Sequence, residues 1–401
     1  MARLSVPHTM HVLTSLRSTA LRRVRCVPLL AVMLAVCVSC STPKPAFDES
    51  AQRAVQALTE TAVEKLGVSG LGVGFVRADG AVGAVAVGVD ALGEPLSTQS
   101  RFLSGSVGKT YCAAIALRLV DEGRLDLDGR VADVLGDQDW YARIANAEDI
   151  TLRQLLQHTS GIPEHVWKPA FQEAVASAVD GMTPVESLAF ALDDPAEAPA
   201  GARFSYADTN YLLVGLMIEA VEGRSFDRVL EDRLLGPLGL RATGFNTSRR
   251  LPNLASGMGT GIGFHEGPCV VDGLYFTNPV FEFCGGGVHS TPADLALWLR
   301  ALFAGDAVPE ALRAAHRTPV PAGALGGYGL GCILDDGPQG PEWGHSGVMP
   351  GYLTQALWFP DLEVGVVVML PSDNVRAMGG MKRLCREVAS SLGGHPSVLA
   401  R

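Results

Sequence analysis

The sequence has no long run of basic residues, and its acidic side chains outnumber the basic ones. It contains 42 Asp and Glu against 32 Lys and Arg in 401 residues, for a net charge of −10. A protein that binds nucleic acid needs clustered cations to neutralise the phosphate backbone. The composition therefore argues against nucleic acid as a partner, while the length suffices for one large domain or two lobes with a cleft between them.

The cysteines beyond position 40 form no C-x-x-C pair, so the sequence supports no zinc site and we expect no metal. They are Cys112, Cys269, Cys284, Cys332 and Cys385. Cys269 and Cys284 are candidates for a disulfide in an oxidising compartment, but separated single thiols are as often small buried hydrophobic side chains. The sequence leaves both alternatives open.

The N-terminal apolar run, Val27 to Val38, is too short to span a membrane comfortably. A short apolar run after basic residues is the layout of a secretory signal, and here the basic residues are Arg17, Arg22, Arg23 and Arg25. The pair Ser39-Cys40 at its end resembles the bacterial lipoprotein signal, although Cys37 stands where that signal usually has Leu.

We therefore expect residues 1–39 to be a signal peptide, Cys40 to be lipidated, and residues 40–50 to be a linker. Acyl chains on Cys40 would attach the protein to a membrane without a spanning helix. This predicts export to the bacterial cell envelope, facing the periplasm. The alternative is an ordinary cleaved signal in which Cys40 is incidental.

Strand patterns occur at both ends of the remaining chain, residues 51–395. Leu71–Val76 and Ala81–Val89 flank an Asp-Gly turn, and later apolar runs cover Tyr328–Leu334, Glu342–Ser346, Leu353–Phe359 and Val364–Leu370. The simplest α+β fold pairs these terminal strands in one antiparallel sheet, a lobe of about residues 51–100 and 290–395.

Helical patterns fill the segment between the two groups of strands. They cover Val107–Glu122, Leu152–His158, Tyr211–Val221 and Ala293–Phe303, and another covers Phe47–Lys65 before the first strand. We expect residues 101–289 to form a mostly helical lobe, with a cleft beside the sheet. The glycine-rich stretch Gly257–Gly263 is expected to be a flexible loop.

A nucleophile motif precedes the helix that ends near Glu122. Ser106-Val107-Gly108-Lys109 places the lysine one helical turn after the serine and on the same face. Serine needs a neighbour that takes its proton and donors that hold an oxyanion, and a partly desolvated Lys109 suits the first task. An isolated S-x-x-K is more often a capping serine with a solvated lysine, so the motif needs further support.

Two other nucleophile or phosphate motifs fail on their spacing. Gly108-Lys109-Thr110 ends like a P-loop, but Leu103 stands where that motif requires glycine. Gly344-His345-Ser346-Gly347 resembles a G-x-S-x-G elbow, but Val348 stands at its last glycine. The glycine-rich stretch after Ser256 fits no G-x-G-x-x-G pattern, so a dinucleotide site is not supported either.

Five segments in order resemble the family of class C β-lactamases, serine D-alanyl-D-alanine carboxypeptidases and related esterases. The likeness runs from about Gly70 to Leu370. Its segments are Ser106–Lys109, Ile150–Pro163 with His158-Thr159-Ser160-Gly161, Pro199–Tyr211 with Tyr206, Gly236–Gly239, and His345–Gly347.

The resemblance implies a β-lactamase/transpeptidase-like fold and acyl transfer through a covalent serine ester, with no cofactor. Ser106 matches the family nucleophile, Lys109 the lysine that helps to deprotonate it, and Tyr206 the tyrosine that shuttles the proton. The backbone N–H groups of Ser106 and Val348 would form the oxyanion hole. His158, Thr159 and Ser160 are interpreted as structural residues that hold a turn.

His345, Ser346 and Gly347 stand where β-lactamases of this family usually have Lys-Thr-Gly. The resemblance places this strand along the cleft opposite the serine, so we expect these residues and Val348 to contact substrate. The family's Tyr-x-Asn is Tyr206-Ala207-Asp208 here. An ionised Asp208 can only accept hydrogen bonds, which disfavours substrates whose side-chain amide must be bound. It can instead pair with Lys109, raise the pKa of that lysine and leave Tyr206 as the base.

Asp208 and His345 set the order of the functional hypotheses. A carboxylesterase or peptidase-like hydrolase comes first, a D-alanyl-D-alanine carboxypeptidase second and a β-lactamase third. The substrate in each case is a small molecule or peptide with an acyl bond. The alternative from another class is an inactive envelope binding or sensor module, which would not need Ser106, Lys109 and Tyr206 together.

Overall fold

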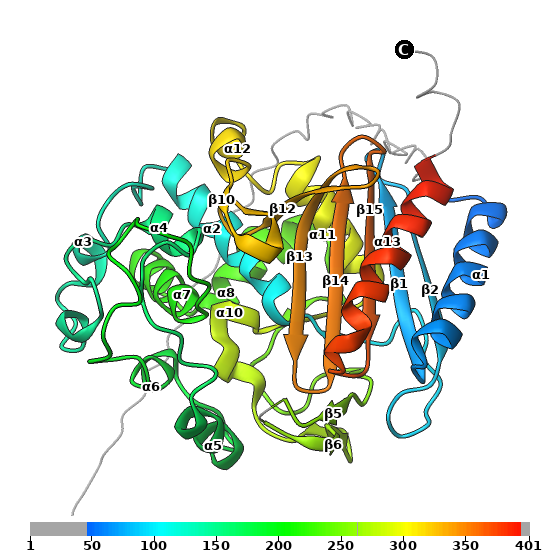
Figure 1. The fold of residues 1–401 in the computed structure, drawn as a ribbon, viewed down its shortest axis with the longest axis horizontal. Coiled ribbons are helices and arrows are strands. Elements are labelled where there is room, and N and C mark those ends of the chain that lie inside the picture. The colour runs from blue at the N-terminus through cyan, green and yellow to red at the C-terminus, as the bar shows by residue number, and fades with distance from the viewer. Residues whose placement is uncertain (1–45, 263, 394–401) are drawn as a thin grey trace, which may run out of the picture. The chain divides into compact units, whose positions relative to one another are not determined.

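The computed structural model describes residues 46–262 and 264–393, so the signal peptide and Cys40 lie outside the described residues. Its centre is an eight-stranded antiparallel sheet in the order β10-β11-β12-β13-β14-β15-β1-β2 (Figure 1). The strands are β1 Gly70–Arg77, β2 Val82–Gly88, β10 Val320–Pro321, β11 Gly327–Tyr328, β12 Ile333–Gly337, β13 Gly340–Met349, β14 Tyr352–Phe359 and β15 Val364–Leu370.

The strands from the N-terminal and C-terminal parts of the chain pair in this one antiparallel sheet, as predicted. β1 pairs with β15, with Gly72 opposite Met369 and Arg77 opposite Val364. β15 reads as a continuous apolar run because both faces of the sheet are covered there. Val366 and Val368 face one core, whereas Val367 and Met369 face the other.

Helices cover both faces of the sheet (Figure 1). α1 (Glu49–Leu66) and α13 (Met378–Gly393) lie on one face, and α11 (Pro292–Phe303) packs on the other. α1 begins where Asp48 accepts a hydrogen bond from the Ala51 N–H and ends at Gly67, whose φ of 62° suits glycine. Thr291 caps α11, where its side chain accepts a hydrogen bond from the Asp294 N–H.

The helical lobe lies beside the β13 side of the sheet. Its core is α2 (Gly108–Asp121), which packs against α7 (Thr209–Glu222) and α10 (Phe283–Gly286). The remaining helices are α3 Ala132–Leu135, α4 Leu152–Leu156, α5 Pro169–Ser177, α6 Pro184–Leu188, α8 Phe226–Leu230, α9 Gly236–Leu238 and α12 Glu310–His316.

Short strands add detail that the periodicity does not show. One small sheet joins β3 (Phe102–Leu103), β9 (Val288–Ser290) and β4 (Gly244–Phe245), and one hairpin joins β7 (Val270–Val271) and β8 (Leu274–Tyr275). The expectation of a loop over Gly257–Gly263 is wrong in part, because β5 (Met258–Thr260) pairs with β6 (Glu266–Pro268). The Met258 N–H also donates to the Pro371 carbonyl, so the segment is held on two sides.

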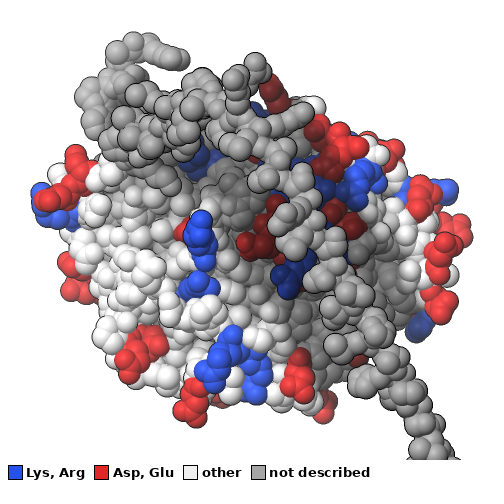
Figure 2. All heavy atoms as spheres, turned by 180° about the vertical axis from the view of Figure 1, so that it is seen from behind, with Lys and Arg blue, Asp and Glu red and all other residues white. Residues whose placement is uncertain are grey.

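The structure describes the cysteines and part of the surface charge. All five described cysteines are buried free thiols, so Cys269 and Cys284 form no disulfide here. On the described part of the face in Figure 2, basic and acidic side chains are interspersed and form no basic stripe. Within residues 46–262 and 264–393, no helix has the length and apolarity required to cross a membrane.

Candidate active site

Ser106 lies in a one-turn 3-10 helix, η1 (Gly105–Val107), between β3 and α2. The chain turns sharply there, with Gly105 at φ 52°. A Cβ on Gly105 would lie 2.7 Å from the Val348 nitrogen, and a Cβ on Gly347 would lie 1.9 Å from the Ser104 carbonyl oxygen. Both glycines are therefore needed for β13 to approach the serine turn.

Lys109, in the first turn of α2, is fully buried and points at Ser106. Its Nζ donates to Ser106 Oγ at 3.1 Å, to the Gly285 carbonyl at 2.7 Å, and to Asp208 Oδ1. Burial by itself would lower the pKa of Lys109, but the charge of Asp208, aided by Tyr328 and Glu282, raises it above the usual range. Lys109 is thus a charged ammonium beside the serine oxygen.

Tyr206 lies in the loop before α7, and its ring stacks on His158 with centroids 4.1 Å apart. Lys109 Nζ is 5.1 Å from the centroid of the Tyr206 ring. Burial raises the pKa of the phenol well above its usual range, Asp208 raises it further, and a hydrogen bond with Ser106 opposes the rise. Tyr206 is therefore a neutral phenol in the resting site.

The three side chains can carry out proton transfer around an ionised serine oxygen. The Lys109 ammonium stabilises negative charge on Ser106 Oγ, and the Tyr206 hydroxyl next to it can pass a proton. The structure thus brings together the three residues that the sequence selects as catalytic.

Asp208 precedes α7 but does not cap it, because its side chain turns to Lys109 instead. This is the pairing that the sequence predicts. Burial raises the pKa of Asp208, while the charge of Lys109 lowers it. From the sequence, we expect this pairing to leave Tyr206 as the base. The same carboxylate also raises the pKa of the phenol, so Tyr206 keeps its proton in the resting site.

His345 lies on β13 with both ring nitrogens bonded inside the protein. Nδ1 lies 2.5 Å from the Ser346 carbonyl oxygen, and Nε2 lies 2.9 Å from the Tyr328 hydroxyl. Burial, aided by the charge of Lys109, lowers the pKa of His345 to about 3. The ring is neutral, so it gives a substrate no positive charge.

A pocket of about 260 Å³ opens in front of Ser106. His345, Ser346 and Val348 line it, whereas Gly347 contributes only the close backbone approach. Its acidic lining residues are Asp208 and Glu282, and no Lys or Arg among the described residues lines it. Its apolar wall consists of Val166, Trp167, Ile262, Phe264, Leu325, Ile333, Met349 and Pro350.

Comparison with known proteins identifies the family. A family model described as Beta-lactamase matches residues 55–387. The chain belongs to this beta-lactamase family. Penicillin-binding protein 4 of Amycolatopsis lactamdurans is 31% identical over 326 residues, covering 75% of this chain and 80% of that one. The family assignment confirms that the protein is a serine hydrolase.

Solved structures confirm the β-lactamase/transpeptidase-like fold of this beta-lactamase-family protein. A D-stereospecific amidohydrolase from Streptomyces is 29% identical with a TM-score of 0.70, covering 80% of this chain and 94% of that one. A D-amino acid amidase from Ochrobactrum anthropi, solved with D-phenylalanine, has a TM-score of 0.73 at 22% identity, covering 86% and 100%. The second likeness concerns the fold alone.

Glu282 lines the pocket, although no sequence motif assigns it a role. It ends the 3-10 turn η4 (Pro279–Glu282), and its side chain forms no hydrogen bond or ion pair within the described part of the chain. Burial raises its pKa to about 8, Asp208 adds to the rise, and Lys109 opposes it. The only sequence signal is its position three residues before Gly285.

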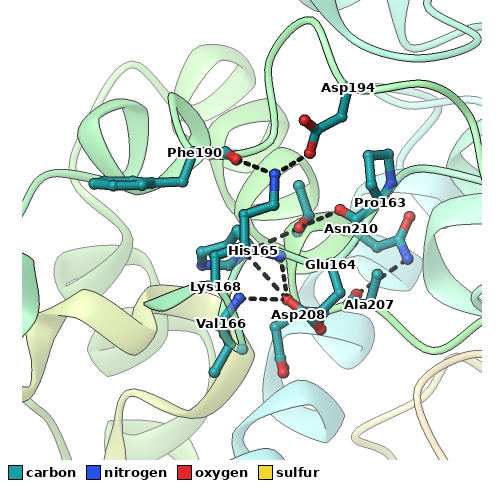
Figure 3. Close-up of polar contacts among 12 residues, drawn as sticks. Pro163, Glu164, His165, Val166, Lys168, Phe190, Asp194, Ala207, Asp208 and Asn210 are labelled. Carbon is teal, nitrogen blue, oxygen red and sulfur yellow. Dashed lines mark hydrogen bonds and ion pairs between the residues drawn. The ribbon is translucent and has the colours of Figure 1, made fainter. Parts of the chain in front are cut away.

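Glu164 supports the same region from behind, and it too was missed by the sequence analysis. Its carboxylate accepts hydrogen bonds from the backbone N–H groups of Asp208 at 2.6 Å and Val166 at 2.9 Å (Figure 3). Burial by itself would raise the pKa of Glu164, but its contacts with His165, Val166 and Asp208 lower it. Glu164 is therefore ionised and positions Asp208.

His158 and Ser160 hold the Tyr206 loop, in line with their predicted structural role. His158 Nδ1 accepts from the Ala207 N–H at 3.2 Å, and Ser160 Oγ bonds Asn210 Oδ1. The stacked His158 ring then fixes the plane of Tyr206. No group of three or more His, Cys, Asp or Glu side chains suited to a metal ion occurs in the residues that the structure describes.

Proposed function

We propose that this protein is an exported serine hydrolase that acts on an ester or amide through an acyl-Ser106 intermediate. The observation that carries the proposal is the buried Lys109 ammonium 3.1 Å from Ser106 Oγ, at the floor of a pocket that Tyr206 also lines. Export rests on the N-terminal signal pattern, and Cys40 is the proposed lipid attachment site. A Cys40→Ala variant should remain in the soluble periplasmic fraction, whereas the parent should sediment with membranes.

The proposed reaction has two steps. Ser106 Oγ attacks the acyl carbon and passes its proton to the Tyr206 oxygen, while the Tyr206 phenol passes its own proton to the leaving group in the same relay. The Lys109 ammonium stabilises negative charge on Ser106 Oγ and on the Tyr206 oxygen. The N–H groups of Ser106 and Val348 bind the oxyanion that forms on the substrate. Water then attacks the acyl-enzyme with the same groups working in reverse.

The pocket charges favour substrates without a carboxylate near the scissile bond. A penicillin or a peptide ending in D-alanyl-D-alanine brings a carboxylate, which would meet Asp208, Glu282 and a neutral His345. We therefore place a neutral or cationic amide or ester first, a D-alanyl-D-alanine peptide second and a β-lactam third. The 29% identical amidohydrolase from Streptomyces supports this order.

Covalent labelling tests the proposal. The mature protein is incubated with a fluorescent fluorophosphonate and, in parallel, with a fluorescent penicillin, using Ser106→Ala and Ser346→Ala as variants. We expect fluorophosphonate labelling that is lost only in Ser106→Ala, and slower penicillin labelling. If folded protein takes neither label, the inactive binding module becomes the better hypothesis.

A further inference from the structure

We propose that Glu282, together with Asp208, binds the free ammonium group of the acyl donor, so the preferred substrates are amides or esters of unblocked amino acids. This inference rests on the proposed function and names its substrate class. Glu282 would be a specificity-determining residue that makes no contact with the reacting atoms.

Acidic side chains outnumber basic ones around Ser106. Three carboxyl groups, Glu164, Asp208 and Glu282, act on one another, and one lysine ammonium lies among them. Lys109 is paired with Asp208, and Glu164 is held by backbone N–H groups and lies 3.3 Å from His165 Nδ1. The Glu282 side chain forms no ion pair within the described residues and holds a proton near neutral pH, since its pKa is about 8. A bound substrate ammonium would supply a counter-charge and lower that pKa, so Glu282 would bind it as a carboxylate.

The backbone leaves room for this carboxylate at the pocket wall. A Cβ on Gly286 would lie 2.8 Å from Glu282 Oε2. A Cβ on Gly285 would lie 3.2 Å from Asp208 Oδ1 and 3.5 Å from Glu282 Oε2. The two carboxylates therefore flank one glycine, so a single cation in the pocket can approach both.

The rest of the pocket suits the other parts of an amino-acid amide. Trp167 is 59% exposed although it lines the pocket, and Ile262 and Phe264 line it as well. These apolar residues can contact an amino-acid side chain while Ser106 meets its carbonyl carbon. An unblocked amino acid offers the cation, the side chain and the carbonyl on neighbouring atoms.

The test is competition against the fluorophosphonate at pH 7.0, which works whether or not an amide is turned over. Phenylalanine amide, as the D and the L form, is compared with N-acetylphenylalanine amide as a protector of Ser106. We expect the better unblocked form to protect at roughly 10-fold lower concentration than its N-acetyl derivative. Equal protection by the two would refute the subsite.

Variants assign the effect to Glu282. We expect Glu282→Gln to lose at least about 10-fold in protection by the unblocked amide, with a change of less than about 2-fold for the acetylated one. Where hydrolysis is measurable, the loss should fall on KM more than on kcat. Glu310→Gln, the same change at an exposed residue, serves as the matched control.

Equal losses on both amides would mean that Glu282 acts only on the structure of the pocket, and the inference would be withdrawn. A failure of the proposed function looks different, because the parent protein would then take no fluorophosphonate label at all. Labelling that depends on Ser106 but shows no preference for an unblocked amine overturns the ammonium subsite alone.

Discussion

Asp208 controls the protonation of both groups beside Ser106. Its charge raises the pKa of Lys109 and also the pKa of Tyr206. The resting site therefore holds the Lys109 ammonium and the Tyr206 phenol. Ser106 can lose its proton to Tyr206 only if the phenol gives up its own proton. An asparagine, usual at this position in the family, would not have this effect.

The substitution Asp208→Asn tests this control. Removing the charge should lower the pKa of Lys109 and of Tyr206, which act as an ammonium and a phenol, so the alkaline-side limb of the kcat/KM profile should move to lower pH. The measurement is ester hydrolysis across the pH range. Asp194→Asn removes a carboxylate from another lysine pair and should leave the profile in place. An unmoved limb in Asp208→Asn would show that Asp208 does not set these pKa values.

Glu282 should make stability depend on pH. Its pKa is about 8 in the folded protein and near 4.5 when unperturbed, so the folded state holds the extra proton between these values. Stability from this group is present below pH 4.5 and is lost as pH rises through 8. Glu282→Gln should raise the free energy of unfolding in urea by about 1–3 kcal/mol at pH 9 and by much less at pH 5.

The residues found from sequence are those with a local motif. Ser106 and Lys109 are one helical turn apart, and Tyr206 sits in an ordered series of family segments, so their proximity at one site can be predicted. Glu282 could not, because its proximity to Asp208 depends on how α10 packs against α7. The hydrogen-bond contact between Tyr328 and His345 likewise depends on how β11, β12 and β13 pair in the sheet.

At the scale of elements, the site depends on how closely β13 approaches η1. Gly347→Ala should push the strand away from Ser104, since its new Cβ would lie 1.9 Å from a carbonyl oxygen. We expect kcat to fall about 100-fold as the oxyanion donors separate, and stability to fall by about 1–3 kcal/mol. Gly379→Ala in α13 has open space around its Cβ and is the control. Unchanged kcat in Gly347→Ala would contradict the placement of the oxyanion hole.

The predicted strand bounds are correct where hydrophobic periodicity alone determines the strand. They are wrong where a turn divides or ends it. β15 covers the predicted Val364–Leu370, because a buried apolar run has few alternatives. The run Tyr328–Leu334 instead divides into β11 and β12, since Gly331 turns at φ 87°. The β5–β6 hairpin was missed because glycine-rich sequence carries no alternation, and Met258 pairs there through its backbone.

At the scale of the whole molecule, the last helix is tied to the strand that carries the site. Glu342 on β13 is 1% exposed and accepts from Arg386 of α13 at 2.5 and 2.8 Å. Lys382 lies 3.4 Å from the same carboxylate. The C-terminal helix, the sheet and the pocket therefore form one connected unit.

Arg386→Ala measures this connection. The buried carboxylate would lose its bidentate partner, so we expect a loss of about 2–4 kcal/mol in the free energy of urea unfolding. Arg383→Ala, at an exposed position of the same helix, should cost less than about 0.5 kcal/mol. Equal effects of the two substitutions would show that the Glu342 pair does not hold α13 to the sheet.

The central claim is a covalent acyl group on Ser106, and mass spectrometry of the intact protein tests it most directly. The mature protein is mixed with an excess of an activated ester, such as a p-nitrophenyl ester, and quenched in acid within seconds. The account predicts one added acyl mass, located by peptide mapping to Ser106 and absent from Ser106→Ala. Turnover of the ester with no adduct on Ser106, or an adduct that persists in Ser106→Ala, would contradict it.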